Sequence, residues 1–360
     1  MRKIASLLIL ILTVFLTSCN PTSNRTKLVE SNIDYFQYFD TLIYLRVWDT
    51  KKYNSDSELW KGAEDIIKHI QLTFQKTKDG DFEPELYKLN QSAGSGQPFK
   101  VSYDLFEVLK LGLEFAELTD GKFDPTIGPL VDLWDINNKA GKDAAPPSQE
   151  EIEAILPLID YRLVELDEEN KTVLLPLKGM AIDLGAIAKG YAADVLADYF
   201  KANGIEHAII NLGGNIFAIG KRYEKRFDGR EEWAIGIRDP RFSAEDSIAN
   251  VYIVDKTIVT SGTYERFFRD INDTSKTYHH ILNPDTGYPY DNNISSVTII
   301  CDSSALADAL STSLFALGIE NGIKFLEGQF PDVAAVFIDN DMNFYKTSNI
   351  DELYDFEPFI

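Results

Sequence analysis

The segment Ser303–Gly318, SSALADALSTSLFALG, has the pattern of a helix that is apolar on nearly every side except at Asp308 and Thr312. A serine at its start and Gly318 at its end are residues that commonly cap a helix. A helix that is apolar almost all round belongs in the interior of a protein. The segment therefore predicts a chain folded around a buried helix that carries one carboxylate.

Asp308 and Thr312 lie one helical turn apart and share a face. A buried ionised carboxylate costs several kcal/mol unless it is paired or bound to a metal. A carboxylate and a hydroxyl in this arrangement are suited to a hard cation such as Mg²⁺. In the other interpretation, Asp308 pairs with a lysine or arginine and Thr312 bonds back to its own helix. The segment alone favours this second interpretation, so the outcome depends on what the rest of the chain brings to the helix.

Residues 1–18 have the features of a signal peptide, with Arg2 and Lys3 followed by an almost wholly apolar run. The run is shorter than the ~20 apolar residues of a membrane-spanning helix. Cys19 follows small residues at the end of the run and resembles the cysteine of a bacterial lipobox, which is lipidated and becomes the first mature residue. The alternative is a plain signal peptide beside a chance cysteine.

We therefore expect residues 19–32 to form a polar tether and residues 33–360 to form the folded domain. The mature protein is expected outside the cytoplasm, on the periplasmic side of the membrane in a Gram-negative cell, and held to the membrane by lipid only. The other cysteine, Cys301, lies in a strand-like run and is predicted to be a buried, inert thiol.

The 360-residue chain carries a formal net charge of −22. This charge argues against nucleic acid as a partner and against electrostatic binding of anionic lipid head groups. It does not exclude a phosphate ligand, which needs only local positive charge, backbone N–H groups or a metal.

Periodic patterns along the body predict both helices and strands. The predicted helices span residues 57–76, 102–119, 184–203 and 321–326, with another that starts after Ser148. The predicted strands span residues 35–48, 207–212, 233–238, 248–254, 258–260, 296–301 and 333–339, with a hairpin over 162–176. This mixture predicts an α+β fold of mainly antiparallel sheets with flanking helices, in two intimately packed lobes.

The segment Met180–Ala193, MAIDLGAIAKGYAA, has the pattern of a strand end, a glycine turn and a helix start. Lys189 falls in the first turns of that helix. A lysine near a helix N-terminus is suited to a phosphate, because its charge adds to that of the free N–H groups. A capped helix with a solvated lysine is an equally good interpretation of this segment alone.

The segment Tyr278–Gly287, YHHILNPDTG, places His279 and His280 shortly before a turn. A histidine in this position can act as a base or orient a phosphate. Two ordinary strand-end histidines are the better interpretation of the segment alone, and the pair lacks the spacing of a zinc-binding helix.

The loop 121–129, GKFDPTIGP, is made rigid by its Asp-Pro and Gly-Pro steps. Phe123 offers a stacking face for a ligand and Asp124 a hydrogen-bond acceptor, although a purely structural loop has the same pattern. The paired glycines of Asn211–Asn215, NLGGN, allow close approach of the backbone, and an ordinary turn is the favoured interpretation.

Seven motifs resemble those of the FAD:protein FMN transferase family, also called ApbE, and fall in the family's order. They lie within residues 121–318 and read GKFDPTIGPLVDLW, AIDLGAIAKGYAAD, INLGGNI, WAIGIRDP, VTSGTYERFF, YHHILNPDTGYP and SSALADALSTSLFALG. The resemblance implies an ApbE-like fold and an enzyme that splits FAD at its pyrophosphate and releases AMP. The FMN is joined by a phosphoester to a Ser or Thr hydroxyl of a target protein, typically a membrane-bound redox subunit with a short acceptor motif.

The resemblance also implies which residues form the site. Mg²⁺ would be held by Asp308, Thr312 and the backbone carbonyl of Ala186. Lys189 would hold the pyrophosphate, and His280 would position or deprotonate the acceptor hydroxyl, so that the catalytic residues are His280, Lys189 and Asp308. The other residues in contact with FAD would be Asp183, Glu265 and Ile281, with Phe123 and Asp124 near the flavin or adenine end.

The chain departs from the family pattern at three places. Ala186 stands where members often have threonine, the loop Asp270–Lys276 is longer than expected, and Phe39-Asp40-Thr41 replaces the usual Met-Gly-Thr. Two rival functions remain at this point. One is a Mg²⁺-dependent FAD pyrophosphatase that uses water as the acceptor, and the other is a flavin-binding lipoprotein without chemistry.

Overall fold

The computed structural model of the protein describes residues 27–78, 80–241 and 246–359. The predicted signal peptide and Cys19 lie outside the described residues. None of the helices within the described residues is long and apolar enough to cross a membrane.

The largest sheet formed by the described residues has eight strands, and every neighbouring pair in it is antiparallel. In spatial order the strands are β1 (Val29–Tyr38), β2 (Thr41–Asp49), β7 (Ala208–Leu212), β8 (Asn215–Ile219), β11 (Lys256–Gly262), β14 (Ile294–Cys301), β15 (Ala334–Asp339) and β16 (Phe344–Lys346).

Both faces of this sheet are buried at β15, which explains why that strand is apolar without a break from Ala334 to Ile338. On β15, Ala335 and Phe337 face one hydrophobic cluster, whereas Val336 and Ile338 face another. The first cluster is covered by α1 (Glu58–Phe74), α3 (Tyr103–Leu118), α7 (Ala188–Ala202), α8 (Ser304–Leu317) and α9 (Ile319–Gln329). The second is covered by a small sheet of β9 (Trp233–Arg238), β10 (Ser247–Ile253) and β17 (Asp355–Pro358), with α10 (Ile350–Leu353).

A smaller lobe is built around Trp134, which is fully buried. It combines a sheet of β4 (Asp143–Ala144), β12 (Phe267–Asp270) and β13 (Thr277–His279) with α4 (Gly128–Trp134), α5 (Ile136–Lys139) and α6 (Gln149–Ile155). The remaining elements are α2 (Glu85–Gln91), a sheet of β3 (Phe99–Lys100), β5 (Glu165–Asp167) and β6 (Thr172–Leu174), and two 3₁₀ turns at Leu156–Leu158 and Tyr161–Leu163. The predicted fold class, α+β with mainly antiparallel sheets, flanking helices and two packed lobes, is confirmed.

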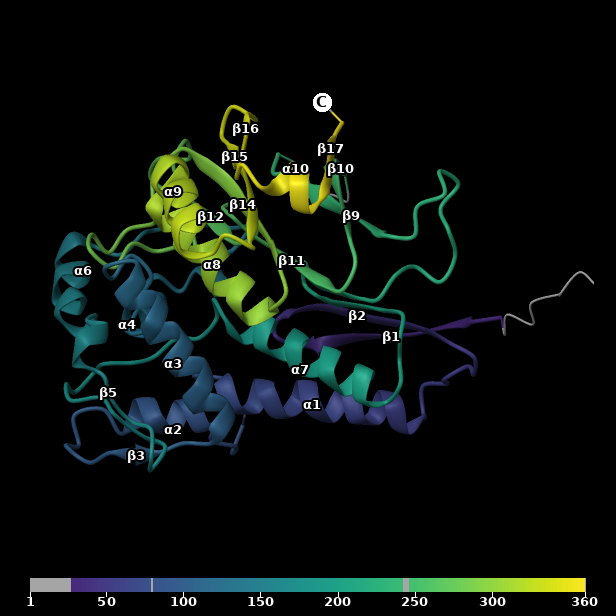
Figure 1. Cartoon of the computed structure of the whole chain (residues 1–360). Helices are drawn as coiled ribbons and strands as arrows, with labels where there is room; N and C mark the ends of the chain where they lie inside the picture. The colour runs from purple at the N-terminus through teal and green to yellow at the C-terminus, as the bar shows by residue number, and fades with distance from the viewer. Residues whose placement is uncertain (1–26, 79, 242–245, 360) are drawn as a thin grey trace, which may run out of the picture.

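The helix over Ser303–Gly318 is confirmed, and it lies inside the molecule. Ser303 caps it, because its side chain accepts a hydrogen bond from the N–H of Leu306 at 3.3 Å, and Gly318 ends it with a φ of 82°. In Figure 1, α8 lies beside α7, and α7 lies beside α1 beneath the large sheet.

Two predictions about the first strand differ from the structure. The expected single strand 35–48 is a hairpin, whose two-residue turn Phe39–Asp40 has φ of 54° and 50°. Turns of this kind usually contain glycine, so Phe-Asp gives no recognisable turn signal. Moreover, β1 begins at Val29, so the last four residues of the expected tether 19–32 pair with β2 instead.

The helix predicted over 184–203 begins only at Ala188. Residues 185–187 form a turn that leads into it, and this turn contains Ala186. This difference matters because it leaves the backbone carbonyl of Ala186 outside the regular hydrogen bonding of the helix.

Candidate active site

The start of α7 crosses α8 at very close range. A Cβ atom placed on Gly190 would lie 2.2 Å from the backbone oxygen of Ser304, so a glycine is required at the crossing. The N–H of Gly190 donates a hydrogen bond of 2.7 Å to Oδ2 of Asp308. The close crossing therefore brings the N-terminal end of one helix to the carboxylate of the other.

Asp308 is only 4% exposed, yet it has no ion-pair partner among the described residues. Burial raises the pKa of its carboxyl group, whereas the nearby charge of Lys189, the N–H of Gly190 and the side chain of Asn215 lower it. The first part of the alternative interpretation, an Asp308 paired with lysine or arginine, does not describe this structure. A buried carboxylate without an ion-pair partner is stabilised by binding a cation.

The hydroxyl of Thr312 has no hydrogen-bond partner within the described residues, and so the second part of that interpretation fails as well. The carbonyl of Asp308, to which a threonine four residues on would bond back, accepts instead from Oγ of Ser311 at 2.9 Å. Asp308 and Thr312 thus offer two oxygens on one face of α8.

The carbonyl of Ala186 accepts no hydrogen bond from the part of the chain that the structure describes. Its usual helical donor would be the N–H of Gly190, which donates to Asp308 instead. Carboxylate, hydroxyl and carbonyl oxygens without competing partners are the donor set of a hard cation, so these residues fit Mg²⁺. No group of three or more His, Cys, Asp or Glu side chains suited to a metal occurs in the described ranges.

A lysine and a second carboxylate, Lys189 and Glu265, interact electrostatically with Asp308. Lys189, the second residue of α7, is half-buried and interacts electrostatically with Asp308, Glu265 and His280. The side chain of Glu265 keeps access to solvent, yet the protein atoms crowded around its carboxyl group raise its pKa, against the effect of Lys189.

His280 follows β13, on the smaller lobe. Its Nδ1 lies 3.3 Å from the carbonyl oxygen of Arg266. Since a carbonyl only accepts, Nδ1 carries the proton and Nε2 keeps its lone pair. Burial, reinforced by the charge of Arg266, lowers the pKa of His280 to about 3. The imidazole is therefore neutral at physiological pH and presents an acceptor nitrogen.

His279 is the structural member of the pair. Its Nε2 donates to the carbonyl of Tyr290 at 2.9 Å, and its Nδ1 accepts from the N–H of Ile281 at 3.3 Å. Both ring nitrogens are therefore occupied, and burial lowers the pKa of the ring. Ile281 itself is 5% exposed, and its carbonyl accepts from the N–H of Tyr290 at 3.0 Å.

Asp183 joins the same assembly through Arg266, which interacts electrostatically with Asp183, Glu265 and His280. The structure thus brings together Asp183, Ala186, Lys189, Glu265, His280, Asp308 and Thr312, which come from separate segments of the chain. Arg266 belongs to one of the family motifs, but nothing in the sequence showed that it would interact with Asp183 and His280 together.

Phe123 and Asp124 are embedded in the protein instead. The ring of Phe123 is 6% exposed and packs edge-on against Phe115. Asp124 accepts from the N–H and the hydroxyl of Thr126 at 2.7 and 2.6 Å and from the N–H of Tyr161 at 3.0 Å. In this structure both residues stabilise their loop, and neither presents the free stacking face or free acceptor expected from the sequence.

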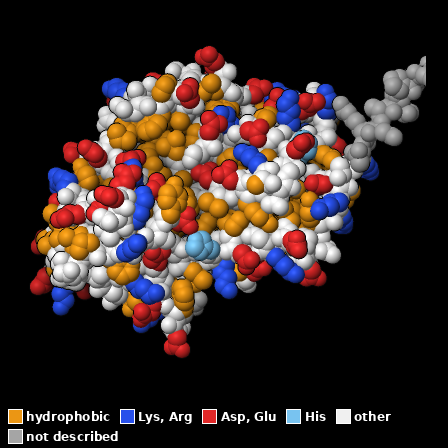
Figure 2. All heavy atoms as spheres, turned by 60° about the horizontal axis from the view of Figure 1, so that its bottom comes forward, with side chains coloured by type: hydrophobic (Ala, Val, Ile, Leu, Met, Phe, Trp, Pro, Cys, Tyr) orange, Lys and Arg blue, Asp and Glu red, His pale blue; other side chains and the backbone are white. Residues whose placement is uncertain are grey.

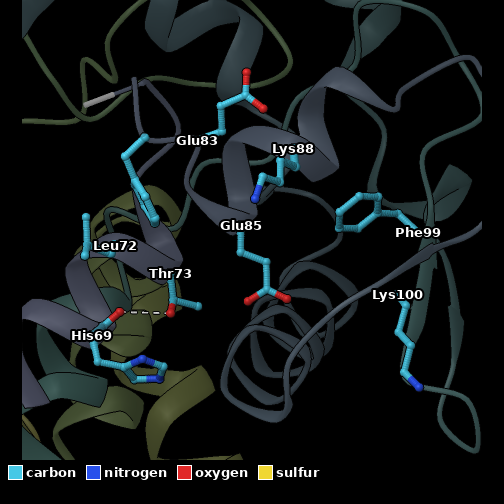
Figure 3. Close-up of a pocket in the computed structure, with 9 residues that line it drawn as sticks. His69, Leu72, Thr73, Glu83, Glu85, Lys88, Phe99 and Lys100 are labelled. Atoms are coloured by element: carbon cyan, nitrogen blue, oxygen red, sulfur yellow. Dashed lines mark hydrogen bonds between the residues drawn. The ribbon is translucent and has the colours of Figure 1, made fainter. Parts of the chain in front are cut away.

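A hollow of about 450 Å³ lies on another part of the surface (Figure 3). It is lined by polar and apolar side chains of α1, α2 and β3 and the loop between the helices: His69, Leu72, Thr73, Phe82, Glu83, Glu85, Lys88, Phe99 and Lys100. None of the predicted site residues lines it. On the face seen in Figure 2, acidic and basic side chains are interspersed.

The fold and the assembled residues define a flavin-transferase type of protein, and the chain belongs to the ApbE family, whose sequence model matches residues 39–337. It is 37% identical to the FAD:protein FMN transferase of Klebsiella pneumoniae (strain 342) over 290 residues, 80% of this chain and 84% of that protein. It is also 37% identical to the FAD:protein FMN transferase of Treponema pallidum (strain Nichols) over 308 residues, 83% of this chain and 82% of that protein.

Solved structures give the same result. The crystal structure of the ApbE protein of Thermotoga maritima has a TM-score of 0.75 and 29% identity, covering 90% of this chain and 99% of that one. The flavin transferase ApbE of Vibrio cholerae has a TM-score of 0.75 and 26% identity over the same shares. The family resemblance and the enzyme class predicted from the sequence, FAD:protein FMN transferase, are confirmed by these relatives.

Proposed function

We propose that this protein transfers FMN from FAD to a Ser or Thr hydroxyl of a target protein, releases AMP, and requires Mg²⁺. The observation that carries the proposal is the buried Asp308, which has no ion-pair partner among the described residues and lies beside Thr312 and Lys189. A site with a free carboxylate and a nearby lysine is suited to a metal-bound pyrophosphate. The names of the relatives supply the substrates.

Asp308, Thr312 and the carbonyl of Ala186 would hold the cation. When bound, Mg²⁺ neutralises charge on the pyrophosphate and stabilises the oxygen on which AMP departs. Lys189, at the N-terminal end of α7, binds the pyrophosphate with its ammonium group, whose charge adds to that of the helix end. Asp183, Glu265 and Ile281 complete the FAD contacts in this proposal.

The proposed reaction uses groups from both lobes of the molecule. The acceptor oxygen forms a bond to the phosphorus of the FMN half, the bond from that phosphorus to the AMP oxygen breaks, and AMP leaves. The proton of the acceptor hydroxyl passes to Nε2 of His280, whose Nδ1 is held by the carbonyl of Arg266. The low pKa of the free enzyme's imidazole keeps that nitrogen unprotonated before the anionic substrate arrives.

The FAD pyrophosphatase differs from this reaction only in using water as the acceptor. Incubation with FAD and Mg²⁺, with and without a protein domain that carries a Ser/Thr acceptor motif, separates the alternatives. We expect AMP release together with a target whose mass increases by that of FMN less one water, as a phosphoester requires. AMP without protein-bound flavin would favour the hydrolase, and no AMP would favour the non-catalytic binder.

The proposed place of action is the extracytoplasmic side of a bacterial membrane, with a membrane-bound redox subunit as target. Cys19 is proposed as the lipidated residue, on the pattern of the first 19 residues. Replacement by serine (Cys19→Ser) is expected to abolish incorporation of labelled palmitate and to release the protein from the membrane fraction. Unchanged labelling in that variant would contradict the anchor.

A further inference from the structure

Lys76 is a largely buried lysine next to the site that no sequence motif singled out. It follows the end of α1 and has a side chain that is 20% exposed. Its Nζ lies 2.8 Å from Oδ1 of Asp132 on α4 and 2.8 Å from Oδ2 of Asp183 in the loop before α7. One ammonium group therefore connects three elements at the edge of the site.

The loop that holds Asp183 is attached to the smaller lobe by its backbone as well. The N–H of Asp183 donates to the carbonyl of Pro125 at 2.8 Å, and the N–H of Gly128 donates to the carbonyl of Ala181 at 3.1 Å. Oδ1 of Asp183 accepts from the N–H of Gly185 at 2.8 Å. The carboxylate of Asp183 thus shapes the turn that presents Ala186 and leads to Lys189.

Lys76 also controls the charge of that carboxylate. Burial alone would raise the pKa of Asp183, but the ion pair with Lys76 and the N–H of Gly185 hold the pKa below its usual value, with a contribution from Arg266. Asp132 is the other charged group that contacts Lys76. Without Lys76, Asp132 and Asp183 would lose the cation between them, and of the charges that lower the pKa of Asp183 only that of Arg266 would remain.

We infer that Lys76 is a positioning residue for FAD, which acts by holding the Asp183 carboxylate and its turn in the geometry that the pyrophosphate requires. This inference rests on the proposed function, because it assumes that FAD occupies the site. The alternative is that Lys76 only stabilises the fold, as a bridge between α1 and α4.

The test measures the dissociation constant of FAD by titration calorimetry, together with the melting temperature of each variant. For Lys76→Met we expect FAD affinity to fall roughly 10-fold. Effects of this size are typical when a residue that orients a ligand-binding side chain is lost. Lys76→Arg should restore most of the affinity. In the background of Asp183→Asn, Lys76→Met should change FAD affinity by less than about twofold, because the carboxylate that Lys76 holds is already absent.

Affinity should also become more sensitive to pH in Lys76→Met. The pKa of Asp183 rises when Lys76 is removed, so its carboxylate is protonated as the pH falls, and FAD binding changes over a range where the wild type is constant. Asp132→Asn breaks the other ion pair and should leave FAD affinity within about twofold. Lys110→Met, which removes the exposed pair with Glu168 at 3.0 Å, is the matched control.

A purely structural bridge would lower the melting temperature in Lys76→Met and Asp132→Asn alike and leave FAD affinity unchanged. That result, or equal effects of Lys76→Met with and without Asp183→Asn, would overturn the inference. If Lys76→Met does not fold, the comparison of Asp132→Asn with Lys76→Arg and Asp183→Asn still decides between the two roles. If the wild type itself fails to bind FAD, the proposed function fails instead.

Discussion

Two aspartates, Asp194 half-buried and Asp308 buried, lie where α7 and α8 cross, and their surroundings differ. Asp194, on α7, accepts hydrogen bonds from the N–H of Ser304 at 2.7 Å, the N–H of Ala305 at 3.0 Å and the hydroxyl of Ser303 at 2.8 Å. Asp308, on α8, accepts one backbone hydrogen bond, from Gly190 at 2.7 Å. Each carboxylate faces the N-terminal end of the other helix, where negative charge is favoured.

The comparison separates a structural carboxylate from a functional one. Burial raises the pKa of both groups, and hydrogen bonds oppose it in both. Asp194 has its bonding capacity filled by the cap of α8, which fixes the crossing of the two helices. Asp308 keeps capacity for a further partner in a place where an uncompensated charge is costly, and we assign that capacity to a cation.

The largest expected effect comes from Asp308→Asn, which removes the charge and keeps the shape. AMP release from FAD in Mg²⁺ should fall by roughly 1,000-fold, about 4 kcal/mol of transition-state stabilisation. The melting temperature should stay the same or rise, because the variant removes a buried charge that has no ion-pair partner among the described residues. Chromatography of AMP and a thermal melt are the two measurements, and unchanged turnover would rule out the metal assignment.

Asp194→Ala should give the opposite pattern. Three donors at the start of α8 lose their acceptor, and we expect the free energy of unfolding to fall by about 3 kcal/mol. Denaturant unfolding measures this change. Asp194→Asn, which keeps one acceptor oxygen, should recover part of the stability and retain AMP release. A large loss of turnover in a folded Asp194→Asn would contradict the purely structural role of Asp194.

The adjacent histidines differ in the same way, with His280 functional and His279 structural, and smaller effects are expected. His280→Gln should lower the rate of FMN transfer by roughly 100-fold with FAD affinity preserved, because only the proton acceptor is lost. His279→Gln should lower the melting temperature, since two backbone contacts lose their partner. Equal effects of the two substitutions on transfer would contradict the assignment of Nε2 of His280 as the acceptor nitrogen.

The pKa of His280 adds a pH dependence with a definite sign. The folded-state value of about 3 is below the ordinary value of 6.5 for histidine, so the unfolded chain binds the proton more readily. Stability should therefore be lost as the pH falls below about 6.5 and on toward 3, and His280→Gln should lessen this loss. Unfolding measured across that pH range gives the result.

The smallest effect is expected from Thr312→Val. The variant keeps the shape of the side chain and removes one neutral oxygen ligand, so the concentration of Mg²⁺ needed for half-maximal AMP release should rise roughly 10-fold. Ser311→Ala removes the neighbouring hydroxyl, which bonds to Ser261 and to the carbonyl of Asp308, and serves as the control. An equal shift in both variants would show that Thr312 is not a ligand.

Much of this arrangement could be predicted from sequence because it is local. The spacing of apolar residues indicated α8, its cap and the shared face of Asp308 and Thr312. The family motifs include Lys189, Glu265 and His280, which the fold then brings together. Burial of Asp308 and the missing back-bond of Thr312 depend on three-dimensional contacts, since Ser311 has the same local opportunity and takes that carbonyl.

Other features could not be predicted, for identifiable reasons. The turn Phe39–Asp40 has no glycine, and so the strand pattern runs through it. The ion pair of Lys76 with Asp183 joins residues far apart in the chain, and a lone lysine after a helix has no pattern. Phe123 and Asp124 looked available for a ligand because a motif does not show that other side chains of the fold already contact them.

The most direct test of the central claim is the binding of Mn²⁺, as a spectroscopic substitute for Mg²⁺, measured by electron paramagnetic resonance in the presence of FAD. The wild type and Asp194→Asn should bind one ion with the same affinity, and Asp308→Asn should bind it at least roughly 100-fold more weakly. Undiminished Mn²⁺ binding by a folded Asp308→Asn would contradict the account, because the cation would then be held by other groups.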